Sequence, residues 1–495
     1  MRSGATTSGP IWLGVDVGTQ SARVLAVSPV GEVLGAGTCK LASRRDGVRH
    51  EQDPATWWNA VVEACRAALA ALPAERIAGV AVDGTSGTVL LADERGAPLT
   101  PGIMYDDGRA AEEARAVNEV GGEVWARLGY RMQPSWALPK VVWLARHHQL
   151  ARGAARLLHQ TDFINRQLVG REVVSDTSTA LKSGYDLLEE RWPGEVLDAL
   201  RIDRRWLPEV VRPGSGIGEV GREAAAATGI PEGTPVIAGM TDGCAAQIGA
   251  GALRVGSWNV VLGTTLVFKG VTPELIRDPA GVVYCHRSPD GNWLPGGASS
   301  TGAGALTHHF PNRDLDELSS RAAAYEPAGV VAYPLVSRGE RFPFIAPEAE
   351  GFMLGESRDE AQRYAALLQG VALVERLCFD YLDMLGAPVD GELRLTGGGA
   401  KSRYWCQLRA DVLGRPVCLP EQAEAALGMA VLAASHGRRV ADVAGEMVRV
   451  RETIEPRADG RAKFDEAYLQ LVNALARRGW LPEAVAAHAR KRAER

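Results

Sequence analysis

The stretch IWLGVDVGTQSARVLAV (residues 11–27) is the strongest structural signal in the chain. Two runs rich in aliphatic residues flank the turn Gly-Thr-Gln (18–20), a pattern typical of a β-hairpin. The pattern returns in GSWNVVLGTTLVFKG (256–270), where the turn is Gly-Thr-Thr (263–265). Because a strand, a Gly-Thr turn and a second strand occur once in each half, we expect a duplicated domain.

Length and composition set the broad class of the protein. A chain of 495 residues is too long for one hydrophobic core and predicts two domains. Its net charge of -5 gives no basic footprint for nucleic acid. No stretch approaches the roughly 18 uncharged apolar residues of a membrane span, and the seven cysteines lack C-x-x-C spacing. We expect a cytoplasmic monomer or homodimer that binds neither a membrane nor a nucleic acid.

The order of expected elements is that of an α/β protein. Asp53 and Pro54 predict a helix start, because Asp is a favoured N-cap and Pro fits the first helical position. Further expected elements are a buried strand (76–84), a strand and loop (234–243), a long helix (358–386) and a strand (392–400). We place the domains at 11–252 and 253–440, followed by a helical C-terminal extension at 441–495, whose basic end (490–495) is interpreted as a solvated tail.

The first hairpin carries residue types that suit a phosphate and a divalent cation. Asp16 ends the first strand, so its carboxylate lies at the sheet edge, where it can hold Mg²⁺ through waters. Gly18 lets the backbone approach a phosphate, and Thr19 and Gln20 offer donors to its oxygens. The second Gly-Thr turn can hold the opposite side of a polyphosphate. An ordinary hairpin turn with a solvated aspartate is the alternative.

Asp242 follows the strand TPVIAG and lies among small residues that cannot cover it. A kinase that acts on an alcohol needs a base at the acceptor oxygen, and a carboxylate serves. The alternative is an aspartate that caps a helix beginning at Gly243.

Two further stretches follow strands. Three glycines (397–399) leave a flat surface against which a purine or ribose can lie, unless they are only a flexible connection. Asp83-Gly84-Thr85-Ser86 offers short polar groups that can hydrogen-bond sugar hydroxyls, unless it is a plain polar turn.

Taken in order, these motifs resemble those of the FGGY family of carbohydrate kinases. The stretches that carry the resemblance are DVGTQS (16–21), EQDPATWW (51–58), DGTS (83–86), YDDGR (105–109), GMTDG (239–243), LGTT (262–265), GGASSTGAGAL (296–306), YPLVSRGERFPF (333–344) and TGGGAKSRYW (396–405). The resemblance implies an α/β fold of two domains of the actin, hexokinase and heat-shock chaperone type, each with a five-stranded mixed sheet. It also implies that ATP and a sugar bind in a cleft between the domains.

The resemblance further implies a role for particular residues. Asp242 would be the catalytic base and a sugar contact, and Asp16 would lie beside Mg²⁺ and the acceptor hydroxyl. Ser86 is the expected sugar contact on the DGTS turn. The residues implied to bind ATP are Gly18, Thr19 and Gln20 in the first phosphate loop, Gly263, Thr264 and Thr265 in the second, Gly302 and Leu306 beside the nucleotide cleft, and Gly398, Gly399, Ser402 and Trp405 beside the adenosine.

The substrate expectation depends on the DGTS turn. Xylulokinases typically show a Met-His pair where this chain has Thr85-Ser86, and the DGTS and GERFPF stretches look more like pentulose kinases associated with D-ribulose. We therefore expect ATP-dependent phosphorylation of D-ribulose at its C5 hydroxyl, with D-xylulose as the alternative, because the two sugars differ at one centre. Two other classes stay open: an actin-like or chaperone-like ATPase, and a sugar sensor without catalytic activity.

Overall fold

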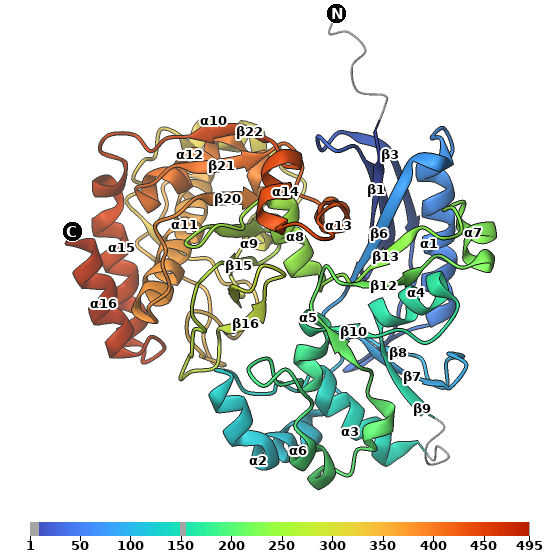
Figure 1. The fold of residues 1–495 in the computed structure, drawn as a ribbon. Coiled ribbons are helices and arrows are strands. Elements are labelled where there is room, and N and C mark those ends of the chain that lie inside the picture. The colour runs from blue at the N-terminus through green and yellow to red at the C-terminus, as the bar shows by residue number, and fades with distance from the viewer. Residues whose placement is uncertain (1–8, 149–154, 495) are drawn as a thin grey trace, which may run out of the picture. The chain divides into compact units, whose positions relative to one another are not determined.

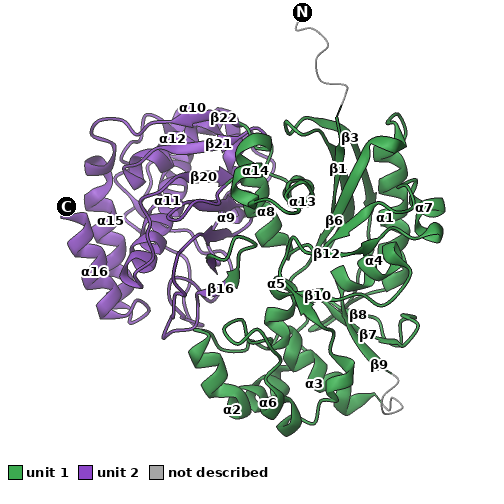
Figure 2. Ribbon diagram, in the orientation of Figure 1, with its two compact units in different colours: residues 1–251, 286–292, 422–449 green, residues 252–285, 293–421, 450–495 purple. Residues whose placement is uncertain are grey.

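A computed structural model describes residues 9–148 and 155–494, which form two compact units (Figure 1). Figure 2 shows the first unit, Met1–Gly251 with His286–Asn292 and Gln422–Arg449, and the second, Ala252–Cys285 with Trp293–Glu421 and Val450–Arg495. In the described part of the chain no helix combines the length and the apolarity that a bilayer crossing requires.

The first unit is built on a mixed six-stranded sheet. Its strands, in spatial order, are β12 (Gly216–Glu219), β13 (Pro235–Ile237), β6 (Ile77–Gly84), β1 (Ile11–Val17), β2 (Ser21–Val27) and β3 (Val33–Lys40). The predicted hairpin is confirmed, since β1 and β2 pair antiparallel from Trp12–Val27 to Val17–Ala22. On its other side β1 pairs parallel with β6.

Successive side chains of β1 point to opposite faces of the sheet, and each face packs against a different layer of helices. Ile11, Leu13, Val15 and Val17 belong to a core shared with α1 (Pro54–Leu69) and α4 (Gln160–Val169). The opposite face approaches α13 (Ala425–Ala434) so closely that a Cβ on Gly14 would lie 1.7 Å from Ala426 O. Only glycine fits there, and Asp16 points to this same face. The predicted start of α1 is confirmed, because the Asp53 side chain accepts from Ala55 N at 3.0 Å.

Smaller elements complete the first unit. A second sheet consists of β4 (Arg44–Asp46), β5 (Arg49–Gln52), β8 (Gly102–Ile103), β7 (Val89–Asp93) and β9 (Ala155–His159). β10 (Ser175–Asp176) pairs with β11 (Val210–Val211). The other helices are α2 (Ala111–Arg127), α3 (Ala137–His147), α5 (Thr177–Ala180), α6 (Gly194–Ala199), α7 (Arg222–Thr228), α8 (Asp242–Ala250) and α14 (Val440–Met447).

The second unit repeats the strand pairing of the first. Its seven-stranded sheet has the order β16 (Tyr284–Arg287), β17 (Trp293–Ala298), β15 (Leu266–Gly270), β14 (Trp258–Leu262), β20 (Leu393–Thr396), β21 (Val417–Pro420) and β22 (Val450–Ile454). β14 pairs antiparallel with β15 and parallel with β20, as β1 pairs with β2 and β6. The sequence echo between the two Gly-Thr turns therefore reflects a repeated topology.

The helices of the second unit pack around one long buried helix. This helix, α11 (Glu360–Met384), is buried on all sides over most of its length, which suits a helix at the centre of a domain. A short antiparallel pair, β18 (Val331–Tyr333) and β19 (Phe352–Leu354), lies in the same unit. The remaining helices are α9 (Gly304–His309), α10 (Leu315–Ala322), α12 (Arg403–Leu413), α15 (Gly460–Arg477) and α16 (Glu483–Ala493).

The structure differs from the sequence expectations in three respects. The sheets have six and seven strands rather than five, because short edge strands such as β12 and β22 extend them. Residues 422–449 group with the first unit, since α13 packs on β1, whereas the expected boundary assigned them to the second domain and the extension. The interpretation of the basic end as a solvated tail is wrong for its described part, because Arg490 and Arg492 lie on α16 and bind Asn473, Asp380 and Asp383.

Candidate active site

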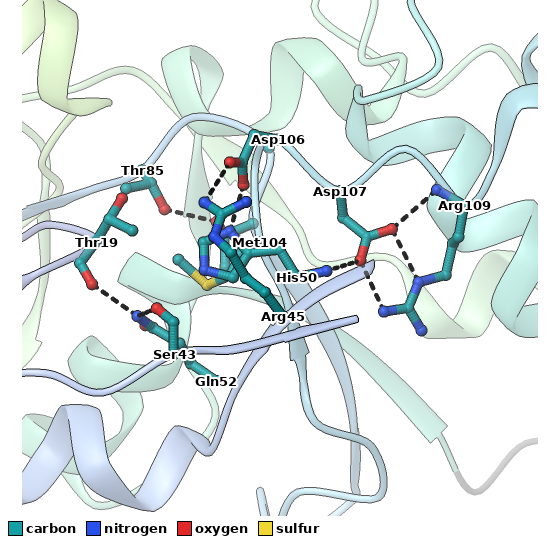
Figure 3. A network of polar contacts seen from close by, with 12 residues as sticks. Thr19, Ser43, Arg45, His50, Gln52, Thr85, Met104, Asp106, Asp107 and Arg109 are labelled. Atoms are coloured by element: carbon teal, nitrogen blue, oxygen red, sulfur yellow. Dashed lines mark hydrogen bonds and ion pairs between the residues drawn. The ribbon is translucent and has the colours of Figure 1, made fainter. Parts of the chain in front are cut away.

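The first expected phosphate loop connects β1 to β2. Hydrogen bonds within the turn and from Gln52 hold it in place. Gly18 N donates to Ser21 O at 3.0 Å. Gln52 Nε2 donates to Thr19 O at 2.7 Å (Figure 3). Gln52 is itself fixed, because Trp57 Nε1 donates to its Oε1 at 2.6 Å. The outer side of the loop stays accessible, and the Gln20 side chain is exposed.

Three carboxyl groups come together at the carboxyl ends of β1 and β6. Asp16 and Asp83 are direct partners on these parallel strands, and Gly84 forms a bridge with Thr241, the residue before Asp242. Burial raises the pKa of Asp16 to about 6, and the Asp242 carboxylate adds to the rise. Burial, followed by the Asp16 charge, raises the pKa of Asp83 well above its ordinary value. At neutral pH this arrangement favours an ionised Asp16 beside a protonated Asp83.

We expect Asp83→Asn to change the pH dependence of thermal stability. Folding raises the Asp83 pKa, so the native state keeps a proton that the unfolded chain loses near about pH 4. The stability contributed by this carboxyl is complete below that pH and is lost as the pH rises toward the raised pKa. Because Asn cannot ionise, the unfolding midpoint of the variant relative to wild type should increase between about pH 5 and about pH 8. A difference that stays constant over this range would show that the Asp83 pKa is not raised.

Asp242 is the first residue of α8, and its Oδ1 accepts from Gly243 N at 2.8 Å. The N-cap is Thr241, so the capping alternative places the helix start one residue too late. The Asp242 charge also acts on Asp16 and Asp83, and it contributes, after burial and Asp106, to a raised Tyr105 pKa. Asp242 therefore belongs to the carboxylate group at the end of β1 and β6 as well as to the helix.

Ser86 lies at the same edge with an unsatisfied hydroxyl. Its Oγ is buried and has no hydrogen-bond partner among the described residues. The neighbouring Thr85 is fixed by Gln160, whose Oε1 accepts from Thr85 N at 2.9 Å and from Thr85 Oγ1 at 2.7 Å. Gln160 Nε2 and Thr161 Oγ1 are likewise buried without a partner in the described chain. Buried polar atoms without partners need explaining, and a polar ligand would satisfy them.

Lys140 connects the residue that follows the DGTS turn to the residue that precedes the YDDGR stretch. Its side chain is fully buried, and Nζ donates to Gly87 O at 3.1 Å and to Met104 O at 2.6 Å. Burial lowers the pKa of Lys140 to about 7. The lysine therefore holds two candidate site loops in one arrangement through their backbones.

Ion pairs fix the rest of the YDDGR stretch (Figure 3). Arg45 Nη2 donates to Asp106 at 2.7 Å, and His50 Nδ1 contacts the other Asp106 oxygen at 2.5 Å. Asp107 is buried, accepts from His50 N at 2.6 Å and pairs with Arg109 at 2.7 Å. These pairs hold Tyr105, which precedes them, in place near Asp242.

In the second unit, the Gly-Thr-Thr turn packs against the segment that follows β17. Gly263 N donates to Thr265 O at 3.1 Å, and Ala303 N donates to Gly263 O at 2.9 Å. A Cβ on Gly302 would lie 2.5 Å from Thr265 Cα and 2.6 Å from Thr264 O. Gly302 thus acts by close backbone approach, which defines the shape of the Gly-Thr-Thr turn.

Glu340 is a buried carboxylate that fixes the same segment, and sequence reasoning did not single it out. Its oxygens accept from Ser299 Oγ at 3.0 Å, Ser300 N at 2.6 Å and Thr301 Oγ1 at 3.3 Å. Tyr333 OH donates to it at 2.9 Å. Thr301 O accepts from Leu266 N at 2.8 Å, so this network reaches the end of the Gly-Thr-Thr turn. Glu340 is part of the GERFPF stretch that contributed to the family resemblance. Its hydrogen-bond partners could be identified only from the packing in the structure.

The residues expected beside the adenosine divide into exposed and buried ones. Gly398 is exposed and a Cβ there would meet nothing within 4 Å, whereas Gly399 packs on Leu262. Ser402 caps α12 by accepting from Trp405 N at 3.3 Å. Trp405 is only 2% exposed, and its Nε1 donates to Leu368 O at 3.1 Å. Trp405 and the equally buried Leu306 therefore support the surface from within rather than offering a face to a ligand.

The residues present suit a cation held mainly by the substrate. No group of three or more His, Cys, Asp or Glu with metal-binding geometry occurs in the described residues. Mg²⁺ is usually held by one or two carboxylates together with waters and phosphates, and Asp16 beside the first phosphate loop can supply one such carboxylate.

The structure divides the expected residues between the units. Asp16, the loop 18–20, Ser86 and Asp242 lie in the first unit, and the remaining expected residues lie in the second. Gln160, Lys140 and Glu340 were not foreseen, since each acts on loops distant in the sequence.

Family comparison accounts for most of the chain, up to residue 436. Residues 11–249 match the N-terminal domain of the FGGY family of carbohydrate kinases, and residues 258–436 match its C-terminal domain. A xylulose kinase from Streptomyces coelicolor is 32% identical over 442 residues, which cover 87% of this chain and 89% of the relative. A gluconokinase from Bacillus subtilis is 27% identical over 445 residues, 85% of this chain and 86% of the relative.

A solved structure agrees with the fold. The crystal structure of a xylulose kinase from Rhodospirillum rubrum superposes with a TM-score of 0.85 at 27% identity, covering 94% of this chain and 98% of that chain. The expectation of an α/β protein with two domains of the actin and hexokinase type is thereby confirmed.

Proposed function

Because this chain belongs to the FGGY family of carbohydrate kinases and is a sugar kinase, we propose that its acceptor is a ketopentose phosphorylated at the C5 hydroxyl. D-Xylulose is the first candidate, since relatives over most of the chain are named xylulose kinases. This ranking reverses the sequence expectation, which placed D-ribulose first.

One observation supports this proposal above all others. Asp16 and Asp83 are register partners, Gly84 bridges to Thr241 before Asp242, and the Ser86 hydroxyl ends the same turn. An ionised carboxylate for proton transfer and buried groups that lack partners thus occur at one sheet edge. A polyhydroxylated acceptor satisfies such groups by exchanging hydrogen bonds with them.

The proposed reaction moves one proton to the protein and one phosphoryl group to the sugar. The Asp242 carboxylate takes the proton of the C5 hydroxyl as its oxygen attacks the γ-phosphorus of ATP, and the bond to the β,γ-bridging oxygen breaks to release ADP. Gly18, Thr19 and Gln20 in the first unit and Gly263, Thr264 and Thr265 in the second offer donors to phosphate oxygens. Mg²⁺, when bound, neutralises the charge that develops on these oxygens, and Asp16 would hold it through waters.

D-Ribulose is the second candidate because of one local feature. Thr85 and Ser86 stand where xylulokinases typically have a Met-His pair, and Thr85 is tied to Gln160. The two sugars differ in configuration at C3, so hydrogen bonds to that hydroxyl decide between them.

The test is a coupled ADP-release screen over D-xylulose, D-ribulose, their L forms, gluconate and glycerol. We expect the highest kcat/KM with D-xylulose or D-ribulose and none above background without sugar. ADP release that is independent of every sugar would favour the actin-like or chaperone-like ATPase. Tight sugar binding without ADP formation would instead support the sensor.

A further inference from the structure

Two helices of the C-terminal extension help to line a cavity that shares no residue with the candidate active site. Its volume is about 160 Å³, and it lies within the second unit, where α15 and α16 pack on α11 and α12 (Figure 1). Its charged lining consists of Arg376 on α11, Arg415 after α12, Arg461 on α15, Arg492 on α16, and Asp380 and Asp390.

Two of these arginines are neutralised by carboxylates. Arg376 Nη2 pairs with Asp465 at 2.6 Å. Arg492 pairs with Asp380 at 2.8 Å and with Asp383 at 2.7 Å. These ion pairs hold α15 and α16 onto α11 and involve two of the four arginines that line the cavity.

Arg415 and Arg461 have no carboxylate within ion-pair distance among the described residues. Arg415 donates to the backbone carbonyls of Val389 and Gly391, and Arg461 Nη2 donates to Arg492 O at 2.5 Å. Burial lowers the pKa of both arginines, and for Arg461 the charge of Arg376 adds to the effect. Both side chains are partly exposed, and the charges of Asp390 on Arg415 and of Asp465 on Arg461 oppose the lowering of the pKa. An anion in the cavity would add the direct acceptors that these carboxylates do not supply.

Arg376, whose guanidinium lies over the Tyr468 ring at 4.2 Å, also has one N–H group without an acceptor among the described residues. Its side chain is only 4% exposed, and Nη1 is buried without a hydrogen-bond partner in the part of the chain described. A buried guanidinium N–H that lines a cavity and lacks an acceptor is the feature expected of an unfilled anion site.

We propose that this cavity binds a phosphate group, free or at the end of a small phosphate ester, through Arg376, Arg415 and Arg461. Guanidinium groups on three separate elements reach a tetrahedral anion from several sides, whereas a planar carboxylate is matched by one bidentate fork. The volume corresponds to about five waters at roughly 30 Å³ each, and cofactor pockets usually exceed about 300 Å³. The cavity therefore has room for a phosphate group and is smaller than a usual cofactor pocket.

The experiment is calorimetric titration of the full chain with inorganic phosphate. We expect saturable binding by wild type, at least about tenfold weaker binding by Arg461→Gln and by Arg376→Met, and unchanged binding by Arg477→Met, an exposed arginine of α15 outside the cavity. Phosphate should also raise the unfolding midpoint of wild type more than that of Arg461→Gln, because it binds the native state. Arg461→Gln loses no ion pair, so its fold should persist even if Arg376→Met unfolds.

Further titrations identify the source of the phosphate and the place where it binds. A ketopentose 5-phosphate that binds more tightly than inorganic phosphate, with the same loss in Arg461→Gln, identifies an ester as the ligand. Thr264→Val, in the second phosphate loop, should leave this binding unchanged. Absence of saturable binding, equal affinity in wild type and both arginine variants, or loss of binding in Thr264→Val would each overturn the proposal. None of these readouts depends on sugar turnover, so they are independent of the proposed function.

Discussion

Asp242→Asn is expected to lower kcat by about 10²–10⁴-fold, the usual contribution of a general base. Asparagine keeps the shape of the side chain and can still accept from Gly243 N, so α8 should begin at the same residue. What it loses is the capacity to take the proton of the attacking hydroxyl. Steady-state kinetics with ADP release, at saturating sugar and ATP, measures the effect.

The matched control is another aspartate at a helix N-terminus. Asp359 caps α11 by accepting from Gln362 N at 2.8 Å, and it lies outside the candidate site. Asp359→Asn should retain wild-type kcat, because Asn caps helices about as well as Asp. If Asp242→Asn also retained wild-type turnover, with ATP saturating, the assignment of Asp242 as the base would be wrong.

The sequence predicted those parts of the fold that depend on local pattern. The β1–β2 hairpin, the capped start of α1 and the repeat of the hairpin at β14–β15 follow from alternation, turn residues and capping preferences. The short edge strands β12 and β22 did not, because their residues have little burial to impose a period of two. The grouping of 422–449 with the first unit depends on the fit of α13 against Gly14, which no local pattern encodes.

The candidate site shows the same division. Motifs placed Asp16, Ser86 and Asp242 in the first unit, and the register of β1 with β6 explains why Asp16 and the DGTS turn meet. The buried character of Asp83, the support of Thr85 by Gln160 and the role of Glu340 arise from contacts between distant segments. The family resemblance implied that Trp405 lies beside the adenosine, yet its ring is buried. Proximity in sequence indicates a site, and packing decides which of its members are accessible.

Gly302→Ala is expected to weaken ATP binding with little change in the affinity for sugar. The added Cβ would lie 2.5 Å from Thr265 Cα and 2.6 Å from Thr264 O, both backbone atoms that no rotamer change can move. Overpacking of this kind costs about 1–3 kcal/mol, which corresponds to roughly 5- to 150-fold in affinity if the loop shifts by the same energy. Calorimetric titration with ATP and, separately, with the sugar distinguishes a loop effect from general unfolding.

Loop displacement and global destabilisation make different predictions for this variant. The hydrogen bonds from Ala303 N to Gly263 O and from Gly304 N to Thr264 O run through the shifted contact, so the proposed phosphate donors should move. The proposed sugar contacts, which belong to the first unit, should stay in place. Gly122→Ala, within α2, adds a methyl group with nothing within 4 Å and should change neither affinity. Equal losses of ATP and sugar affinity in Gly302→Ala would mean that the glycine supports the fold as a whole and does not shape the second phosphate loop.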